Sequence, residues 1–164
     1  ELEGLMKLDP ELLIHALERS CAIKADVVRQ DERESGLRMI LNFGHTLGHA
    51  VEALRRYRGI LHGEAVAIGM AFAAERSETL GLAPKGTRDR LVALLRRAGL
   101  PTELPAFPRR AYLQALRVDK KKREAKIRFV ALRGIGRAET VPLLPREIVP
   151  PTRAKGRLRR RTRT

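Results

Sequence analysis

The chain is poor in cysteine and in aromatic residues. It has one cysteine, Cys21, no tryptophan and only two tyrosines among 164 residues. A single cysteine excludes an internal disulfide framework and indicates a reducing compartment, so we expect a cytoplasmic protein. The few aromatic side chains leave no stacking platform for the bases of single-stranded nucleic acid. Cys21 stands in a segment with helical periodicity, where we expect it to be a small buried apolar side chain.

Long apolar runs and glycine-rich nucleotide loops are also absent from the sequence. The longest uncharged apolar run, residues 65–74, has about half of the ~20 residues that a membrane-spanning helix needs. We therefore expect a core helix there and no membrane partner. No G-x-G-x-x-G or GGG loop occurs, and a dinucleotide site cannot be located on this chain.

Acidic residues are outnumbered, and the net charge is +15. Residues 153–164 contain seven Lys or Arg and no acid, which leaves 15 − 7 = +8 for the remainder. A basic run of this kind is typical of a solvated, disordered extension. We do not expect nucleic acid as a partner, although a non-catalytic module that binds it through this tail stays open as the alternative from another class.

Apolar residues recur with helical spacing through most of the chain. Helices are predicted over the ranges Pro10–Arg29, Ala65–Leu80, Thr87–Ala98 and Pro108–Val118. Residues 126–132 and 138–143 alternate instead, with glycines between them, and predict a β-hairpin. We expect a mainly α, multi-helical domain over residues 1–150 with one small hairpin near its end, followed by a disordered basic tail over residues 151–164.

Three of the four histidines lie between residues 45 and 62. His45 and His49 stand four apart, so both project from one face of the predicted helix. His62 begins a new apolar run, and a reversal of the chain would bring it back to this pair. A catalytic zinc site uses three protein ligands, which three histidines, or two with a carboxylate, would supply. Such a pair is more often structural, however, and Thr46 replaces the glutamate of the zinc-protease motif, which disfavours that reaction.

Further polar residues precede the histidines at helical spacing. Glu34, Arg38 and Asn42 continue the face of His45 and His49 among apolar neighbours. A guanidinium, an amide and neutral imidazoles together suit a small anionic substrate. The glycines of this region indicate a close approach to the backbone, and either a ligand or a tightly packed helix explains them.

The runs LNFGHTLGHAVEAL (residues 41–54) and LHGEAVAIGM (residues 61–70) resemble the C-terminal domain of the 3-dehydroquinate synthase family, in the sugar phosphate cyclase superfamily. The similarity begins in the segment of residues 12–32 and continues through residues 97–101 to residues 119–121. It covers most of the chain, and it implies the multi-helical fold of that domain.

The resemblance also implies roles for individual residues. His45 and His62 correspond to the histidine ligands of a catalytic divalent metal, Zn or Co, whose third ligand in the family is a glutamate in the nucleotide-binding part. His49 corresponds to a residue of the phosphate-binding and proton-transfer network. The catalytic and substrate-binding positions of the family correspond here to Lys24, Arg38, Asn42, His49 and either Lys120 or Lys121. Glu34 matches a further position near the site.

The reaction implied is that of a phosphate-eliminating lyase of the shikimate pathway. With NAD as cofactor, the family converts 3-deoxy-D-arabino-heptulosonate 7-phosphate into 3-dehydroquinate and phosphate, and the metal polarises the group that is oxidised. The resemblance implies a homodimer at full length. We expect this chain to lack the N-terminal NAD-binding domain and to be inactive alone. Another sugar phosphate cyclase, of the valiolone or deoxyinosose synthase type, is the nearest alternative.

Overall fold

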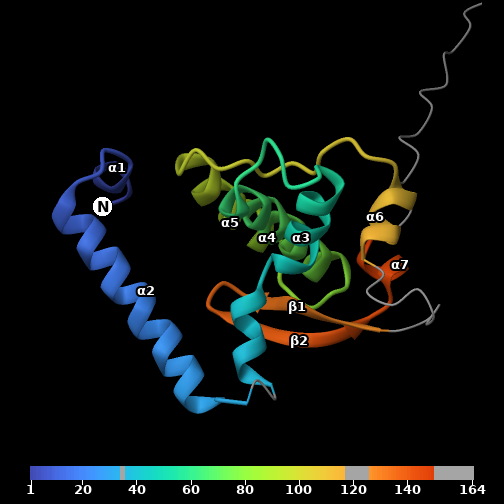
Figure 1. Ribbon diagram of the computed structural model, residues 1–164. Helices are drawn as coiled ribbons and strands as arrows, with labels where there is room; N and C mark the ends of the chain where they lie inside the picture. The colour runs from blue at the N-terminus through green and yellow to red at the C-terminus, as the bar shows by residue number, and fades with distance from the viewer. Residues whose placement is uncertain (34–35, 117–125, 150–164) are drawn as a thin grey trace, which may run out of the picture.

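A computed structural model describes residues 1–33, 36–116 and 126–149. The elements in chain order are α1 (Leu2–Met6), α2 (Pro10–Gln30), the 3-10 helix η1 (Leu37–Asn42), α3 (His45–Leu54), α4 (His62–Thr79), α5 (Thr87–Arg97), α6 (Arg109–Ala115), β1 (Ile127–Gly134), β2 (Arg137–Leu143) and α7 (Pro145–Ile148). Helices α3, α4 and α5 form the body, the hairpin lies against it, and α2 stands apart on one side (Figure 1). Within the described residues the fold is mainly helical with one antiparallel hairpin, as the sequence predicted.

Helix α2 begins and ends close to where the sequence placed it, but the expectation that Cys21 is buried in it is wrong. The Asp9 carboxylate caps the helix by accepting the backbone N–H groups of Glu11 and Leu12 at 3.0 and 3.1 Å, and Pro10 occupies the first turn. No residue of α2 is buried, and Cys21 is exposed. Periodicity identifies an apolar face, but it does not supply a partner that covers it.

Helices α3 and α4 approach each other closely because glycines face the contact. A Cβ on Gly48 would lie 3.2 Å from the carbonyl oxygen of Ala65. A Cβ on Gly69 would contact the carbonyl oxygen of Gly44 and lie 2.9 Å from the backbone nitrogen of Gly48. Close helix packing therefore explains Gly44 and Gly48, and a ligand is not needed to account for them.

The main core forms where α3 and α4 meet the hairpin. Its most completely buried large side chains include Leu47 and Val51 of α3, Phe129 of β1 and Ile148 of α7. Ser77 of α4, also fully buried, connects helix to strand, since its hydroxyl donates to Ala73 at 2.7 Å and accepts the Leu132 N–H at 2.9 Å. The body is thus fixed by apolar packing and by a buried hydrogen bond.

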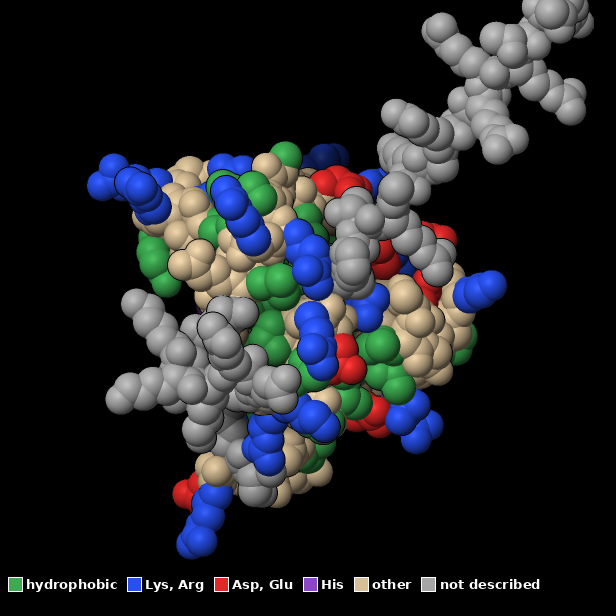
Figure 2. Space-filling view, turned by 90° about the vertical axis from the view of Figure 1, so that its right-hand side faces the viewer, with side chains coloured by type: hydrophobic (Ala, Val, Ile, Leu, Met, Phe, Trp, Pro, Cys, Tyr) green, Lys and Arg blue, Asp and Glu red, His purple; other side chains and the backbone are tan. Residues whose placement is uncertain are grey.

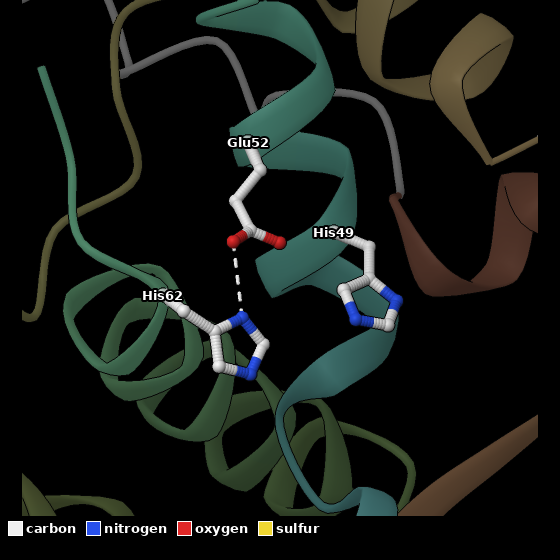
Figure 3. Close-up of side chains that lie close together, drawn as sticks. All are labelled: His49, Glu52 and His62. Carbon is white, nitrogen blue, oxygen red and sulfur yellow. Dashed lines mark hydrogen bonds and ion pairs between the residues drawn. The ribbon is translucent and has the colours of Figure 1, made fainter. Parts of the chain in front are cut away.

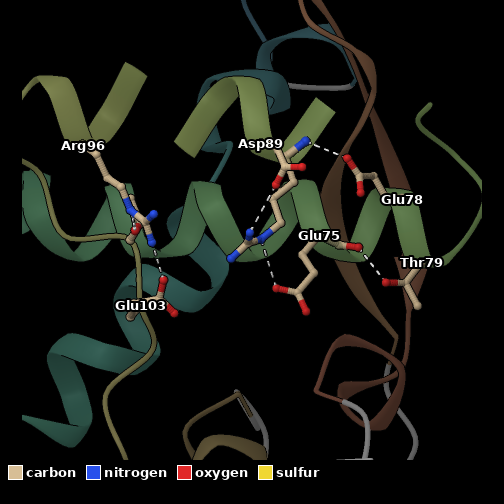
Figure 4. A network of polar contacts seen from close by, with 8 residues as sticks. Glu75, Glu78, Thr79, Asp89, Arg96 and Glu103 are labelled. Carbon is tan, nitrogen blue, oxygen red and sulfur yellow. Dashed lines mark hydrogen bonds and ion pairs between the residues drawn. The ribbon is translucent and has the colours of Figure 1, made fainter. Parts of the chain in front are cut away.

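The start of α5 is held by acidic side chains of α4 (Figure 4). Gly86, the residue before α5, has no side chain to cap the helix. Glu78 replaces that cap by accepting the Arg88 backbone N–H at 2.7 Å. The Arg88 side chain pairs with Glu75 at 3.3 Å, so both the backbone and the side chain of Arg88 connect α5 to α4.

Two arginines connect the short C-terminal helices to the rest of the fold. Arg76 of α4 donates to the carbonyl oxygen of Glu147 at 2.6 Å, and Arg109 of α6 donates to that of Val149 at 2.8 Å. Burial lowers the pKa of Arg76, against the opposing effects of Glu75 and Glu147. These bonds hold α7 against the body.

Basic side chains are distributed over the face seen in Figure 2, with acidic side chains between them. Among the described residues, basic and acidic side chains are thus intermixed on that face. None of the described helices is both long and apolar enough to cross a membrane. The predicted basic tail, residues 151–164, lies outside the described residues.

Candidate active site

An open pocket of about 440 Å³ lies between α2, η1 and α3. It is lined by Lys24, Arg38, Leu41, Asn42 and His45. Lys24 comes from α2, three of the others from η1, and His45 is the first residue of α3. The structure therefore brings together four residues that were predicted from the sequence to bind substrate or metal. Two of them, Lys24 and Arg38, place positive charges at the same opening.

The position of Arg38 depends on the turn that precedes η1. The carboxylate of Asp31, which is 8% exposed, accepts the backbone N–H groups of Gly36 and Arg38 at 2.8 and 2.9 Å. The Arg38 guanidinium donates to the carbonyl oxygen of Glu32 at 2.9 Å. Asp31 was not singled out from the sequence, although it connects the end of α2 to the start of η1.

His45, His49 and His62 form a cluster in which each ring lies near the other two. Their ring centroids are 5.5 Å apart for His45 and His49, 5.4 Å for His45 and His62, and 5.9 Å for His49 and His62. Two imidazoles on one tetrahedral zinc ion would lie about 5 Å apart, since each Zn–N bond is about 2 Å long. The observed ring distances are close to this spacing, and imidazole nitrogens are borderline donors that suit zinc or cobalt.

Two of the three histidines have their Nδ1 atoms next to oxygen acceptors. Nδ1 of His45 lies 3.3 Å from the carbonyl oxygen of Phe43, and Nδ1 of His62 lies 3.0 Å from Oε1 of Glu52. Because a carbonyl or carboxylate oxygen can only accept, both contacts favour a proton on Nδ1 and leave Nε2 open for a metal. His49 has no such contact among the described residues, which distinguishes it from the other two.

Glu52 completes the cluster and was not singled out from the sequence. It follows His49 by three residues on α3, so the two side chains share a helix face, and His62 reaches them from the start of α4 (Figure 3). One donor atom from each of His49, Glu52 and His62 lies within 4.8 Å of the others. The spacing from His49 was the available signal, but only the fold places His62 opposite it.

Three of the sequence-predicted site residues, Glu34, Lys120 and Lys121, lie outside the described residues. The others meet in one region. Lys24, Arg38 and Asn42 line the pocket with His45, while His49 and His62 adjoin it through their ring contacts with His45. The pocket and the histidine cluster therefore meet at His45.

Comparison with known proteins identifies the family. A family model described as 3-dehydroquinate synthase C-terminal matches residues 1–122. The chain belongs to this family. It is 54% identical over 132 residues to the 3-dehydroquinate synthase of Citrifermentans bemidjiense, a match that covers 80% of the chain and 36% of that enzyme. The enzyme of Thermoanaerobacter pseudethanolicus is 45% identical over 145 residues, with 88% of the chain and 41% of that enzyme covered.

Solved structures of sugar phosphate cyclases share the fold of this 3-dehydroquinate synthase C-terminal domain. A 2-deoxy-scyllo-inosose synthase complexed with carbaglucose-6-phosphate, NAD+ and Co2+ matches with a TM-score of 0.72 at 27% identity, over 85% of this chain and 40% of that one. A 2-epi-5-epi-valiolone synthase from Streptomyces hygroscopicus with NAD+ and Zn2+ bound matches with a TM-score of 0.72 at 27% identity, over 90% and 42%. The chain thus spans about two-fifths of the proteins it matches.

Proposed function

We propose that this chain supplies the metal- and substrate-binding part of a 3-dehydroquinate synthase. The reaction is the conversion of 3-deoxy-D-arabino-heptulosonate 7-phosphate into 3-dehydroquinate and phosphate. The observation that carries this proposal is the 54% identity over 132 residues to an enzyme of that name. The clustering of His45, His49 and His62 beside a cationic pocket supports it from the structure.

In this proposal His45 and His62 hold a divalent metal through Nε2. The donor set supports this division, since Nδ1 of each ring faces an oxygen acceptor. When bound, the metal polarises the oxygen of the substrate hydroxyl that is oxidised. The third protein ligand is a carboxylate from the part of the enzyme that the chain does not span, and NAD is bound mainly by that part.

Lys24, Arg38 and Asn42 orient the substrate in the pocket. Arg38 presents a planar fork of N–H donors that matches a carboxylate, and Lys24 adds a second cation from α2. Holding the substrate rigidly beside His45 lowers the entropic part of the barrier. His49 accepts or returns a proton next to the phosphate, and Lys120 or Lys121 stabilises the charge on the departing phosphate.

A different sugar phosphate cyclase is the second candidate. The structural matches to a deoxyinosose synthase and a valiolone synthase favour it, at 27% identity each. The 3-dehydroquinate synthases are more similar in sequence, at 45–54% identity. The histidine cluster alone does not choose between the substrates, so product analysis on candidate sugar phosphates decides.

A chimera tests the proposal. The segment of the Citrifermentans bemidjiense enzyme that matches this chain is replaced by the chain, and purified protein is assayed for phosphate release and for 3-dehydroquinate. We expect turnover of the heptulosonate phosphate. His45→Ala or His62→Ala should each lower metal affinity and activity by more than about 10–100-fold, which is the usual effect of losing a residue that only supports a metal ligand. His49→Ala should keep the metal and lose turnover.

The matched control is Glu103→Gln, which removes an exposed surface ion pair with Arg96 at a residue that lines neither the pocket nor the histidine cluster, and should leave the rate near that of the unmutated chimera. Full zinc content in His45→Ala or His62→Ala would exclude the ligand assignment. Turnover of a different sugar phosphate only, by a chimera with normal metal content, would replace the substrate assignment with the second candidate.

A further inference from the structure

We infer that Glu52 is a positioning residue that fixes His62 in the tautomer with the proton on Nδ1 and so directs Nε2 toward the metal. This inference rests on the proposed function in one respect, the identification of His62 as a ligand. Its core, the tautomer of His62, concerns only residues of this chain and can be measured without a metal.

The Glu52 carboxylate and the His62 ring are in direct contact. Oε1 of Glu52 lies 3.0 Å from Nδ1 of His62, within hydrogen-bonding range. An ionised carboxylate has no proton to donate, so a neutral His62 must place its single ring proton on Nδ1 to make this bond. The ring nitrogen that remains without a proton is Nε2, which Figure 3 shows on the side of the ring away from Glu52.

Glu52 and His62 differ in burial. The Glu52 side chain is 12% exposed, whereas that of His62 is 58% exposed. Among the described residues His62 is the one hydrogen-bonding partner of the Glu52 carboxylate. Burying a carboxylate costs free energy unless the carboxylate is paired, so burial of Glu52 favours its hydrogen bond to the His62 ring. His62 faces outward and can present Nε2 to a bound ion.

Helices α3 and α4, which carry Glu52 and His62, pack closely against each other. Glu52 lies in α3, next to Val51 of the main core, and His62 is the first residue of α4. The glycine contacts between α3 and α4 fix the relative position of these helices. The Glu52 to His62 bond therefore acts between two fixed points, which is what holding a metal-binding ring in one orientation requires.

The alternative is that Glu52 is itself a metal ligand together with His49 and His62, whose donor atoms lie within 4.8 Å of one another. The two assignments predict different behaviour without metal. If Glu52 acts only as a metal ligand, its removal leaves the His62 tautomer of the metal-free protein unchanged. If Glu52 is a positioning residue, its removal changes that tautomer.

The experiment uses the 164-residue chain labelled with nitrogen-15 at histidine, studied by long-range proton–nitrogen NMR at pH 8. In the metal-free protein we expect His62 in the Nδ1-protonated tautomer. Glu52→Ala should shift His62 toward the Nε2-protonated form. Glu52→Gln should largely restore the original tautomer, because the amide oxygen also accepts a hydrogen bond. Circular dichroism confirms that each variant is folded.

Zinc titration of the same samples gives the second readout. Glu52→Ala should weaken zinc binding about 10–100-fold, Glu52→Gln should weaken it less, and the control Glu75→Gln, an acid of α4 that pairs with Arg88, should leave it unchanged. An unchanged His62 tautomer in Glu52→Ala overturns the inference. The inference is also overturned if Glu52→Gln keeps the His62 tautomer but loses zinc as completely as His62→Ala does, because Glu52 would then be a ligand.

The two proposals fail in different ways. If the chimera described above keeps full metal content in His45→Ala or His62→Ala, the metal assignment under the proposed function fails, while the metal-free tautomer of the 164-residue chain still decides the role of Glu52. If zinc binds both histidines but the tautomer ignores Glu52, the inference fails and the proposed function stands.

Discussion

At the scale of single residues, Tyr112 of α6 has an unusual environment for an ionisable side chain. It is 3% exposed, packs edge-on against Phe107 and donates its hydroxyl to the carbonyl oxygen of Pro105 at 2.8 Å. Burial raises the pKa of Tyr112 from 10.0 to about 12, although the positive charge of Arg55 lowers it. The folded state therefore favours the protonated phenol.

This pKa shift predicts how stability changes at high pH. The group's pKa is higher in the folded chain than in the unfolded one, so its contribution is fully present below pH 10 and is lost as the pH rises through about 12. Tyr112→Phe should remove this dependence and cost about 1 kcal/mol at pH 8, since the Pro105 carbonyl loses its donor. Urea unfolding at a series of pH values measures both effects.

The control is Tyr57→Phe, which changes a side chain that is 74% exposed and should leave the pH dependence as in the unmutated chain. Equal loss of stability between pH 10 and 12 in Tyr112→Phe and in the unmutated chain would contradict the prediction.

Residue-scale chemistry was only partly predictable from the sequence. His45 and His49 share a helix face because they stand four apart, which any reader of the sequence can derive. Glu52 was missed because sequence spacing shows which residues share a face but not what lies opposite them. Its partner His62 is ten residues away, across a reversal of the chain whose geometry the sequence does not specify.

At the scale of elements, the contact between α3 and α4 sets the positions of all three clustered histidines. Gly69 lies where α4 meets the backbone of α3, and an added Cβ would meet Gly44 and Gly48. These neighbours are backbone atoms, which cannot move aside as a flexible side chain can. The small residue is thus required by packing.

Gly69→Ala should therefore destabilise the chain by about 1–3 kcal/mol, the usual cost of overpacking. The matched control is Gly63→Ala in the same helix, where an added Cβ meets nothing within 4 Å. Removing backbone freedom there should be neutral or stabilise by up to about 0.5–1 kcal/mol. Urea denaturation of the two variants compares the free energies of unfolding, and similar values for both would contradict this account of the helix contact.

Element positions were predicted well where the sequence carries both a period and an end signal. The helix from Pro10, the helix ending before Gly81 and the hairpin around Gly136 all have such signals, and the structure confirms them. The segment Leu37–Asn42 is a 3-10 helix, which has three residues per turn instead of 3.6. A run of six residues is too short for the two periods to be distinguished from sequence.

At the scale of the whole molecule, α2 differs from the body. It has 21 residues and none is buried, with Ile14, Leu17 and Ile23 more than half exposed. Most of the stability of a helix in a protein comes from the packing of its apolar face, and α2 buries no residue in this way. Helix α4, by contrast, has nine buried residues.

In the isolated chain we expect α2 to unfold locally at a much lower free-energy cost than global unfolding requires. Amide hydrogen exchange followed by mass spectrometry should show α2 exchanging about 100-fold or more faster than α4. Ser20→Ala should slow exchange in α2 modestly, because the exposed Ser20 hydroxyl bonds back to Ala16 and alanine is the better helix former. It should leave α4 unchanged. Uniform protection across α2 and α4 would refute this description of the molecule.

The arrangement of the whole site depended on the resemblance to a family and not on local patterns. Lys24 is separated from Arg38 by the end of α2 and by a turn, so no periodicity places them in one pocket. The structure does so through Asp31, whose carboxylate holds the start of η1. Glu34, Lys120 and Lys121 stay predictions, since they lie outside the described residues.

The pocket is lined by Lys24 of α2 and otherwise by residues of η1 and α3. Ligand binding and the local unfolding of α2 are therefore linked equilibria. An anion held by both Lys24 and Arg38 binds only the molecules in which α2 is in place. At a concentration 100 times its dissociation constant it would stabilise that state by about 2.7 kcal/mol. The concentration of substrate would then determine how often this helix opens.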